Sequence, residues 1–159
     1  MAKFDLQDGN YTVMGARIGI VAARFNQKVV DRLLEGAIDT LKNNGVEEEH
    51  ITTVRVPGAF ELPLTARRLM ENYHLDAVIT LGAVIRGGTP HFEYVAGVCA
   101  NGVSRVSLDQ NLPIIFGVLT TDNMEDAMAR AGGEEGNKGS EAALAALEMV
   151  ALFREIAKS

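Results

Sequence analysis

The sequence is poor in the residues that build disulfides and metal sites. Among 159 residues it has one cysteine, three histidines and no tryptophan. The single cysteine, Cys99, excludes an internal disulfide, and its apolar surroundings favour a buried thiol in a reducing compartment. The histidines at 50, 74 and 91 do not combine with it in any zinc-ligand spacing, so we expect no metal.

The sequence also lacks an excess of basic charge and any long apolar run. It has 15 Lys and Arg against 21 Asp and Glu, a net charge of −6 and a pI near 5.1. This balance gives no electrostatic reason to expect nucleic acid or an anionic membrane as a partner. No signal peptide is recognisable, and no run reaches the length of a membrane span. These absences favour a cytoplasmic enzyme or binding protein.

The chain has the length of one domain, residues 1–159, with 47% apolar residues. Residues 1–15 have no core pattern, so we expect an arm that is either frayed or paired with the sheet of a neighbouring subunit.

Strand and helix patterns alternate along the rest of the chain. Apolar runs predict strands at 17–23, 51–56, 76–85 and 114–121. Helical spacing or helix-start signals predict helices at about 27–43, after Pro63, and at 90–108, 122–130 and 140–157, with a glycine-rich loop at 131–139. This order predicts a three-layer α/β/α sandwich with a central four-stranded parallel sheet, in which ligands bind beyond the carboxyl ends of the strands.

The stretch 80–95 is the most informative. A buried strand leads to Gly87 and Gly88, then to Thr89 as an expected N-cap and Pro90 as the expected first helical residue. The free N–H groups of such a helix start can bind an anion. His91 lies in the first turn, where the helix dipole favours a neutral imidazole that can act as a general base. The alternative is an exposed loop histidine without a role.

Other candidates have two interpretations each. Arg130 and Lys138 flank the second glycine-rich loop, where they could hold a phosphate or be solvated surface charges. Phe25 could stack on a flat ring or pack a loop. Glu61 could accept hydrogen bonds from ring N–H groups or be a helix-start carboxylate. Arg86 could pair across a subunit interface. Neither glycine-rich loop has the Walker A or GxGxxG spacing.

The last predicted helix is apolar on nearly every side. Such a helix needs cover on both flanks, which favours oligomerisation over burial within one subunit.

Five segments of the sequence resemble the 6,7-dimethyl-8-ribityllumazine synthase family. They lie in order from Arg17 onward and without an evident gap: 23–26, 56–63, 82–94, 116–121 and 130–139. The resemblance implies a flavodoxin-like fold and a transferase of riboflavin biosynthesis, which works without cofactor or metal. Its reaction condenses 5-amino-6-(D-ribitylamino)uracil with 3,4-dihydroxy-2-butanone 4-phosphate to 6,7-dimethyl-8-ribityllumazine, phosphate and water.

The resemblance also implies site roles by motif. His91 would be the acid–base residue, and Phe25 would stack on the pyrimidine. The remaining pyrimidine- and ribityl-binding positions would be Ala59, Phe60, Glu61, Ala83, Val84 and Ile85. The phosphate would be held by Gly88, Thr89, Arg130 and Lys138. In the family, the residues matching Phe116, Arg130 and Lys138 come from the adjacent subunit.

Members of the family form homopentamers, and many assemble further into icosahedral sixty-subunit shells, for which riboflavin synthase is the candidate protein partner. This chain departs from shell-forming members at Glu134 and Glu135, where a lysine and a small residue are usual, and at Phe60, where tyrosine is frequent. Two alternatives stay open: a flavin- or nucleotide-binding module without catalysis, and a shell protein whose catalysis has been lost.

Overall fold

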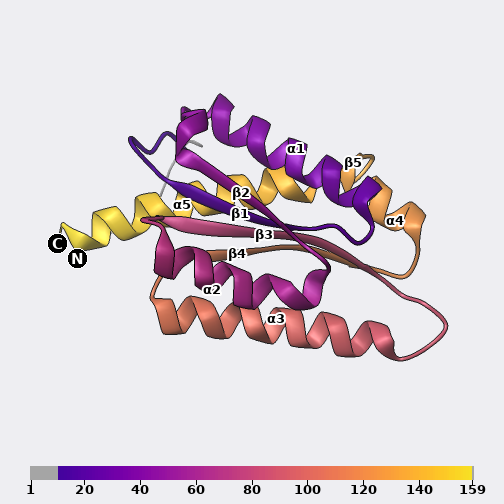
Figure 1. Cartoon of the computed structure of the whole chain (residues 1–159). Coiled ribbons are helices and arrows are strands. Elements are labelled where there is room, and N and C mark those ends of the chain that lie inside the picture. The colour runs from indigo at the N-terminus through magenta and orange to yellow at the C-terminus, as the bar shows by residue number, and fades with distance from the viewer. Residues whose placement is uncertain (1–10, 159) are drawn as a thin grey trace, which may run out of the picture.

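The structure is a computed structural model that describes residues 11–158. These residues are built around a parallel sheet of four strands. The strands are β1 (Ile18–Ala23), β2 (Ile51–Val56), β3 (Ala77–Ile85) and β4 (Ile114–Thr121), in the order β2-β1-β3-β4 (Figure 1). The predicted strand positions and the parallel arrangement are confirmed.

Within residues 11–158, five α-helices connect and cover the strands, and two single-turn 3-10 helices precede β2 and α2. Their bounds are α1 Gln27–Asn43, α2 Leu62–Asn72, α3 His91–Gln110, α4 Met124–Ala129, α5 Lys138–Ala157, η2 Glu48–His50 and η3 Ala59–Glu61.

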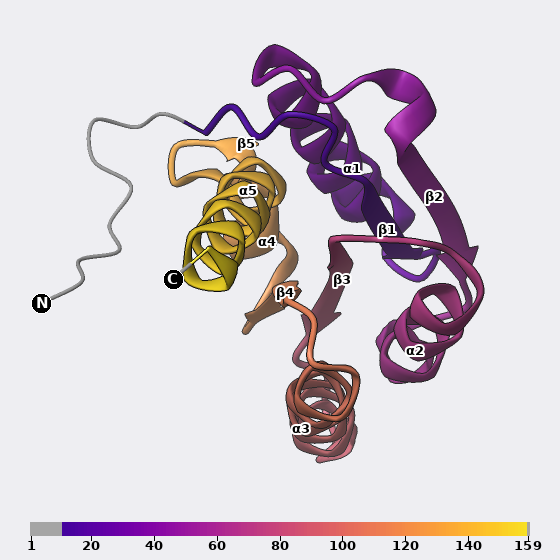
Figure 2. The ribbon, with the colours of Figure 1, turned by 90° about the vertical axis from the view of Figure 1, so that its left-hand side faces the viewer.

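The helices form a layer on each face of the sheet. Figure 2 shows α1 and α5 on one side and α2 and α3 on the other. Each layer has its own buried core: Ile18, Leu33 and Leu147 belong to the first, and Val21, Leu62 and Val106 to the second. The strands β1 and β3 are buried along almost their whole length because both faces are covered. The predicted three-layer α/β/α sandwich is confirmed.

The order of the strands determines where a ligand can enter. Strand β2 lies on one side of β1 and strand β3 on the other, so the connections that follow β1 and β3 run in opposite directions along the sheet. In such sheets the ligand binds in the crevice between these two connections, at the carboxyl ends of the strands. Register aligns Ile85 at the end of β3 with Thr121 at the end of β4.

Two sequence predictions near the C-terminus need correction. The segment 131–139 is not a loop: β5 (Ala131–Gly133) and β6 (Gly136–Asn137) form a small antiparallel hairpin. Helix α5 begins at Lys138 rather than at Ser140, because the side chain of Asn137 accepts hydrogen bonds from the N–H groups of Gly139 and Ser140 and caps the helix.

The C-terminal helix and the N-terminal arm were both predicted to contact other subunits. In the described chain α5 buries Ala142, Ala146 and Leu147, while Phe153 and Ile156 near its end are exposed. In the arm, Tyr11 and Val13 pack on the first core. Residues 1–10, on which most of the arm prediction falls, lie outside the described residues. None of the helices within 11–158 has the length and apolarity to cross a membrane.

Candidate active site

A pocket of about 230 Å³ lies at the carboxyl ends of β1 and β3, on the face covered by α2 and α3. We call it the β3 pocket. Its walls are largely apolar or glycine, and its lining residues are Phe25, Ala59, Ala83, Val84, Ile85, Gly87, Thr89, His91, Phe92 and Val95. His91 is the one titratable side chain among them. The arrangement suits a flat, partly apolar ligand next to a group that can exchange a proton.

Main-chain hydrogen bonds hold Phe25 at the mouth of this pocket. Its N–H donates to the carbonyl oxygen of Pro57 at 3.0 Å, while its side chain is 71% exposed. The next residue, Asn26, has the left-handed conformation (φ 59°) and donates from Nδ2 to the carbonyl oxygen of Ala83 at 2.7 Å. An asparagine after a strand is the signal for such a turn, which sequence reasoning left unused. The turn is therefore tied to β3, and the exposed aromatic ring of Phe25 lines the pocket.

The other wall is the loop from β3 to α3. The prediction of Thr89 as N-cap is wrong: α3 begins at His91, and Pro90 (φ −71°, ψ 7°) is the cap residue. Proline fits there because its fixed φ suits the turn and its missing N–H leaves no unpaired donor. No side chain of the described residues caps this helix end. The N–H of Glu93 donates to the carbonyl oxygen of Pro90 at 3.1 Å, so the N–H groups of His91 and Phe92 are the ones at this helix end that can bind an anion beside the imidazole.

Three predicted positions do not line the β3 pocket. Gly88 lies in the exposed loop, and the ring of Phe60 is 59% exposed on the 3-10 turn η3. Glu61 Oε2 accepts a hydrogen bond from the N–H of Gly58 at 3.0 Å, which makes it a local capping residue. Of the two interpretations of Glu61, the structure therefore favours the helix-start carboxylate.

A second pocket, of about 420 Å³, lies along β4 beside α5. We call it the β4 pocket. Unlike the β3 pocket it is lined by charged side chains, and its residues are Phe116, Val118, Leu119, Thr120, Thr121, Arg130, Glu135, Lys138 and Glu141. Three predicted positions, Phe116, Arg130 and Lys138, thus come together here.

The hairpin β5–β6 brings the two cationic residues together. The backbone N–H of Lys138 donates to the carbonyl oxygen of Arg130 at 2.9 Å, so their side chains leave neighbouring points of the backbone. Gly139 lets α5 begin against α1: a Cβ there would lie 1.9 Å from the carbonyl oxygen of Leu33. The glycines of 131–139 therefore serve a tight hairpin and a close helix contact.

A family model, 6,7-dimethyl-8-ribityllumazine synthase, matches residues 15–154. The chain belongs to the lumazine synthase family. The match spans nearly the whole chain and includes every residue of both pockets.

In this member of the lumazine synthase family, no described residue lines both pockets. The β3 pocket is walled by α3, on one face of the sheet, whereas the β4 pocket lies beside α5, which covers the other face. The predicted residues therefore form two groups in one chain, with His91 in the first and Arg130 and Lys138 in the second.

Sequence reasoning missed several pocket residues. Phe92 and Val95 of α3 line the β3 pocket, and their position in the first turns after His91 was the available signal. Glu135 and Glu141 line the β4 pocket together with the cations. Sequence spacing gave no signal for Glu135, because the hairpin that places it was expected to be a loop. Glu141 lies in α5, three residues after Lys138, and was missed because the helix was expected to begin at Ser140.

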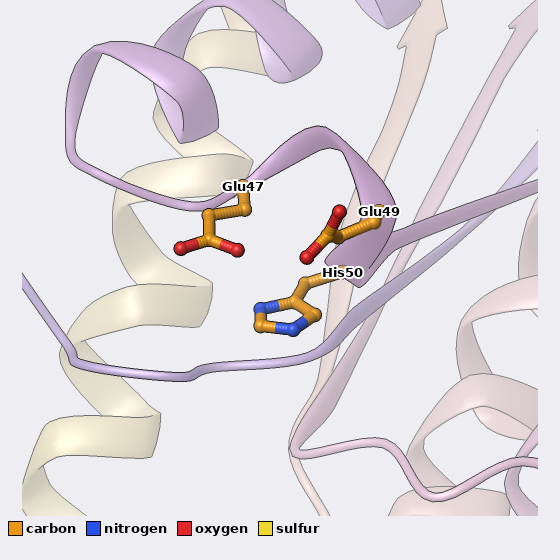
Figure 3. A group of neighbouring side chains, drawn as sticks. All are labelled: Glu47, Glu49 and His50. Atoms are coloured by element: carbon orange, nitrogen blue, oxygen red, sulfur yellow. The ribbon is translucent and has the colours of Figure 1, made fainter.

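A separate group of possible metal ligands lies before β2. The donor atoms of Glu47, Glu49 and His50 lie within 4.8 Å of one another (Figure 3). Both glutamates are exposed, and the three residues line neither pocket. Exposed carboxylates often lie this close without binding a cation, so we assign no function to this group.

Proposed function

We propose that this chain catalyses the condensation of 5-amino-6-(D-ribitylamino)uracil with 3,4-dihydroxy-2-butanone 4-phosphate to 6,7-dimethyl-8-ribityllumazine, phosphate and water, the penultimate step of riboflavin biosynthesis. The observation that carries this proposal is the family match over 15–154, which includes both pockets. The division between an apolar pocket with an imidazole and a pocket with two cations supports it, because one substrate is a flat ring and the other a phosphate ester.

The chemistry requires proton transfers more than any other assistance. The 5-amino group of the pyrimidine attacks the ketone, and water leaves to give an imine. Phosphate is then eliminated, and the resulting enol becomes a second carbonyl. The ribitylamino nitrogen attacks that carbonyl and closes the new ring with loss of the second water. His91 accepts and returns protons during these steps, and no cofactor is required. Holding both substrates in reactive geometry supplies much of the remaining acceleration.

Each pocket receives a role. In the β3 pocket, Phe25 stacks on the pyrimidine, and Ala59, Ala83, Val84 and Ile85 line the pyrimidine and ribityl positions, with Phe60 and Glu61 at their rim. Thr89 and Gly88, with the N–H groups of His91 and Phe92, hold the phosphate from one side. Arg130 and Lys138 hold it from the other side, beside Phe116.

We propose that the two pockets serve one reaction from different subunits. Within a chain they share no described residue, whereas the β4 pocket lies along an edge strand that a neighbouring subunit can approach. We therefore propose a composite site in a homopentamer or a larger shell, in the cytoplasm, with riboflavin synthase as a candidate partner. Light scattering of the purified protein distinguishes pentamer from shell.

The direct test is a turnover assay with the purified protein and both substrates. We expect 6,7-dimethyl-8-ribityllumazine to appear, followed by its absorbance, only when protein and both substrates are present. Absence of product, with protein that arrives yellow with stoichiometric flavin, would favour a binding module instead. Absence of both would favour a shell protein without catalysis.

The composite site has its own test. His91→Ala and Arg130→Ala variants are purified, dissociated, mixed and reassembled. Some mixed interfaces then pair an intact β3 pocket with an intact β4 pocket, so activity should return. The control is each variant taken alone through the same procedure. No recovery from mixtures shown to contain both variants in one assembly would contradict a shared site.

A further inference from the structure

Arg86, the first residue after β3, contacts three structural elements at once. Its Nε donates to Asp122 Oδ1 at 2.9 Å, and its Nη1 donates to the carboxylate of Glu93. The guanidinium also lies over the ring of Phe92, 4.4 Å from the ring centroid. Glu93 and Phe92 belong to the first turn of α3, and Asp122 lies between β4 and α4. One side chain thus joins the end of β3, the start of α3 and the loop after β4.

The loop that Arg86 spans has little other support. Gly87 and Gly88 have no atom within 4 Å of the position where a Cβ would be, and residues 87–91 are all exposed. The backbone before the loop is held, since the N–H of Arg86 donates to the carbonyl oxygen of Thr121 at 2.8 Å. Beyond it, the first turn of α3 depends on side-chain contacts to stay in place. The position of His91 depends on that turn.

An exposed ion pair usually contributes little, and the Arg86 side chain is 45% exposed. Here one planar guanidinium serves two carboxylates and one ring, a geometry that a lysine cannot reproduce. The two hydrogen bonds, to Asp122 and then to Glu93, raise the pKa of Arg86, and the bond from Arg86 lowers the pKa of Glu93. Both groups therefore stay charged at neutral pH, and the network persists.

We propose that Arg86 is a positioning residue, which acts through Glu93 and Phe92 to hold His91 and the first N–H groups of α3 against the β3 pocket. This inference rests on the proposed function for its catalytic consequence only. Through Asp122 the same side chain connects the loop to the end of β4, whose strand lines the β4 pocket.

The first experiment compares Arg86→Met with Arg67→Met. Arg67 forms an ion pair of the same kind with Glu71 on α2, away from both pockets, and serves as the matched control. Misplacing a reactive group by about 1 Å can lower turnover by about 100-fold, so Arg86→Met should lower kcat by about tenfold to 100-fold while the control stays near wild type. KM for the pyrimidine should change little, and Arg86→Lys should recover only part of the loss.

A double-mutant cycle tests whether Arg86 acts through its carboxylate. Glu93→Gln alone should lower kcat, but adding it to Arg86→Met should have little further effect, because the contact is already lost. Fully additive effects would contradict the mechanism. Turnover of Arg86→Met within about twofold of wild type would overturn the proposal. If Arg86→Met does not fold, the Glu93→Gln and Asp122→Asn double variant tests the same network.

Amide hydrogen exchange tests the role of Arg86 without relying on catalytic activity, and so separates it from the proposed function. In the ligand-free protein, amides of 87–95 should exchange faster in Arg86→Met than in wild type or Arg67→Met. If wild type has no condensation activity but exchange accelerates as expected, the proposed function fails while the structural role of Arg86 stands. If wild type is active and exchange is unchanged, the role of Arg86 fails alone.

Discussion

The β3 and β4 pockets differ in what they offer and in how they are built. The first is lined by strand ends, an exposed aromatic ring and one imidazole; the second contains two cations and two carboxylates. The first suits a ring next to a group that can transfer a proton, and the cations of the second suit a phosphate ester. The difference teaches that, within one chain, the apolar and the cationic parts of the candidate site lie in separate pockets. The proposed composite site would join them across a subunit interface.

The supports of the pockets also differ. The β3 pocket rests on the buried strand β3 and on the tethered turn at Phe25 and Asn26. The β4 pocket depends on a short hairpin and on the cap of α5, where Asn137 Nδ2 also donates to the carbonyl oxygen of Arg32 at 3.1 Å. A substitution can therefore damage one pocket and spare the other, and the following predictions use that independence.

The largest expected effect is on turnover, from the β3 pocket. His91→Ala should lower kcat by about 10²- to 10⁴-fold, the usual contribution of a general acid–base group, with little change in substrate affinity. His74→Ala, which alters an exposed histidine outside both pockets, is the control. Steady-state kinetics measures both. Unchanged turnover in His91→Ala would remove the imidazole from its proposed role.

The second prediction concerns the start of α5, next to Lys138 of the β4 pocket. Gly139→Ala places a Cβ 1.9 Å from the carbonyl oxygen of Leu33, so the free energy of unfolding should fall by about 3 kcal/mol, or the chain should fail to fold. Gly97→Ala makes the same change at an exposed position of α3 with open space and should be neutral or stabilising. Urea unfolding compares the two. Equal stability of both variants would contradict the close contact.

A smaller effect should separate the two ligands. Arg130→Ala removes one charge-assisted contact, which is worth about tenfold to 100-fold in affinity for the phosphorylated substrate. Affinity for the pyrimidine should change much less, because Arg130 does not line the β3 pocket. Calorimetric titration of each ligand measures this, with Arg105→Ala on α3 as the control. An equal loss of affinity for both ligands would contradict the proposal that the two pockets bind different substrates.

The smallest effect concerns the helix behind the β3 pocket. Burial raises the pKa of the Cys99 thiol from its usual value near 9 to about 11. Burial therefore favours the neutral thiol in the folded state. The contribution of the neutral thiol to the free energy of unfolding is complete below pH 9 and is lost as the pH rises through 11. Thiol labelling at pH 8 should be slow in native protein and fast after unfolding. Rapid labelling of native protein would show that α3 leaves the sheet readily.

Much of the fold was predictable from the sequence because its signals are local. The four strands appear as apolar runs, and α1 shows the helical spacing of Val30, Leu33, Ala37 and Leu41, so strand positions and sheet type follow. The hairpin at 131–137 was not predictable in this way. Its strands are two and three residues long, too short for a periodic pattern.

In the candidate site, too, local features were predictable from the sequence and contacts between distant segments were not. The loop 87–91, with two glycines, a proline and a histidine after a buried strand, indicates a ligand site from local sequence alone, although the helix cap was misplaced by one residue. The partners of Arg86, seven and 36 residues away, and the backbone contact of Lys138 with Arg130 required the folded chain. Spacing in the sequence does not encode these contacts.

The sequence alone determined the order of strands and helices, and with it the parallel sheet and the edge at which its loops meet, because hydrophobic periodicity and turn residues act over a few positions. Tertiary structure decided which of those loops share a pocket. That choice depends on the strand order β2-β1-β3-β4 and on the face that each helix covers, which bring together groups from distant segments and keep neighbouring pockets apart.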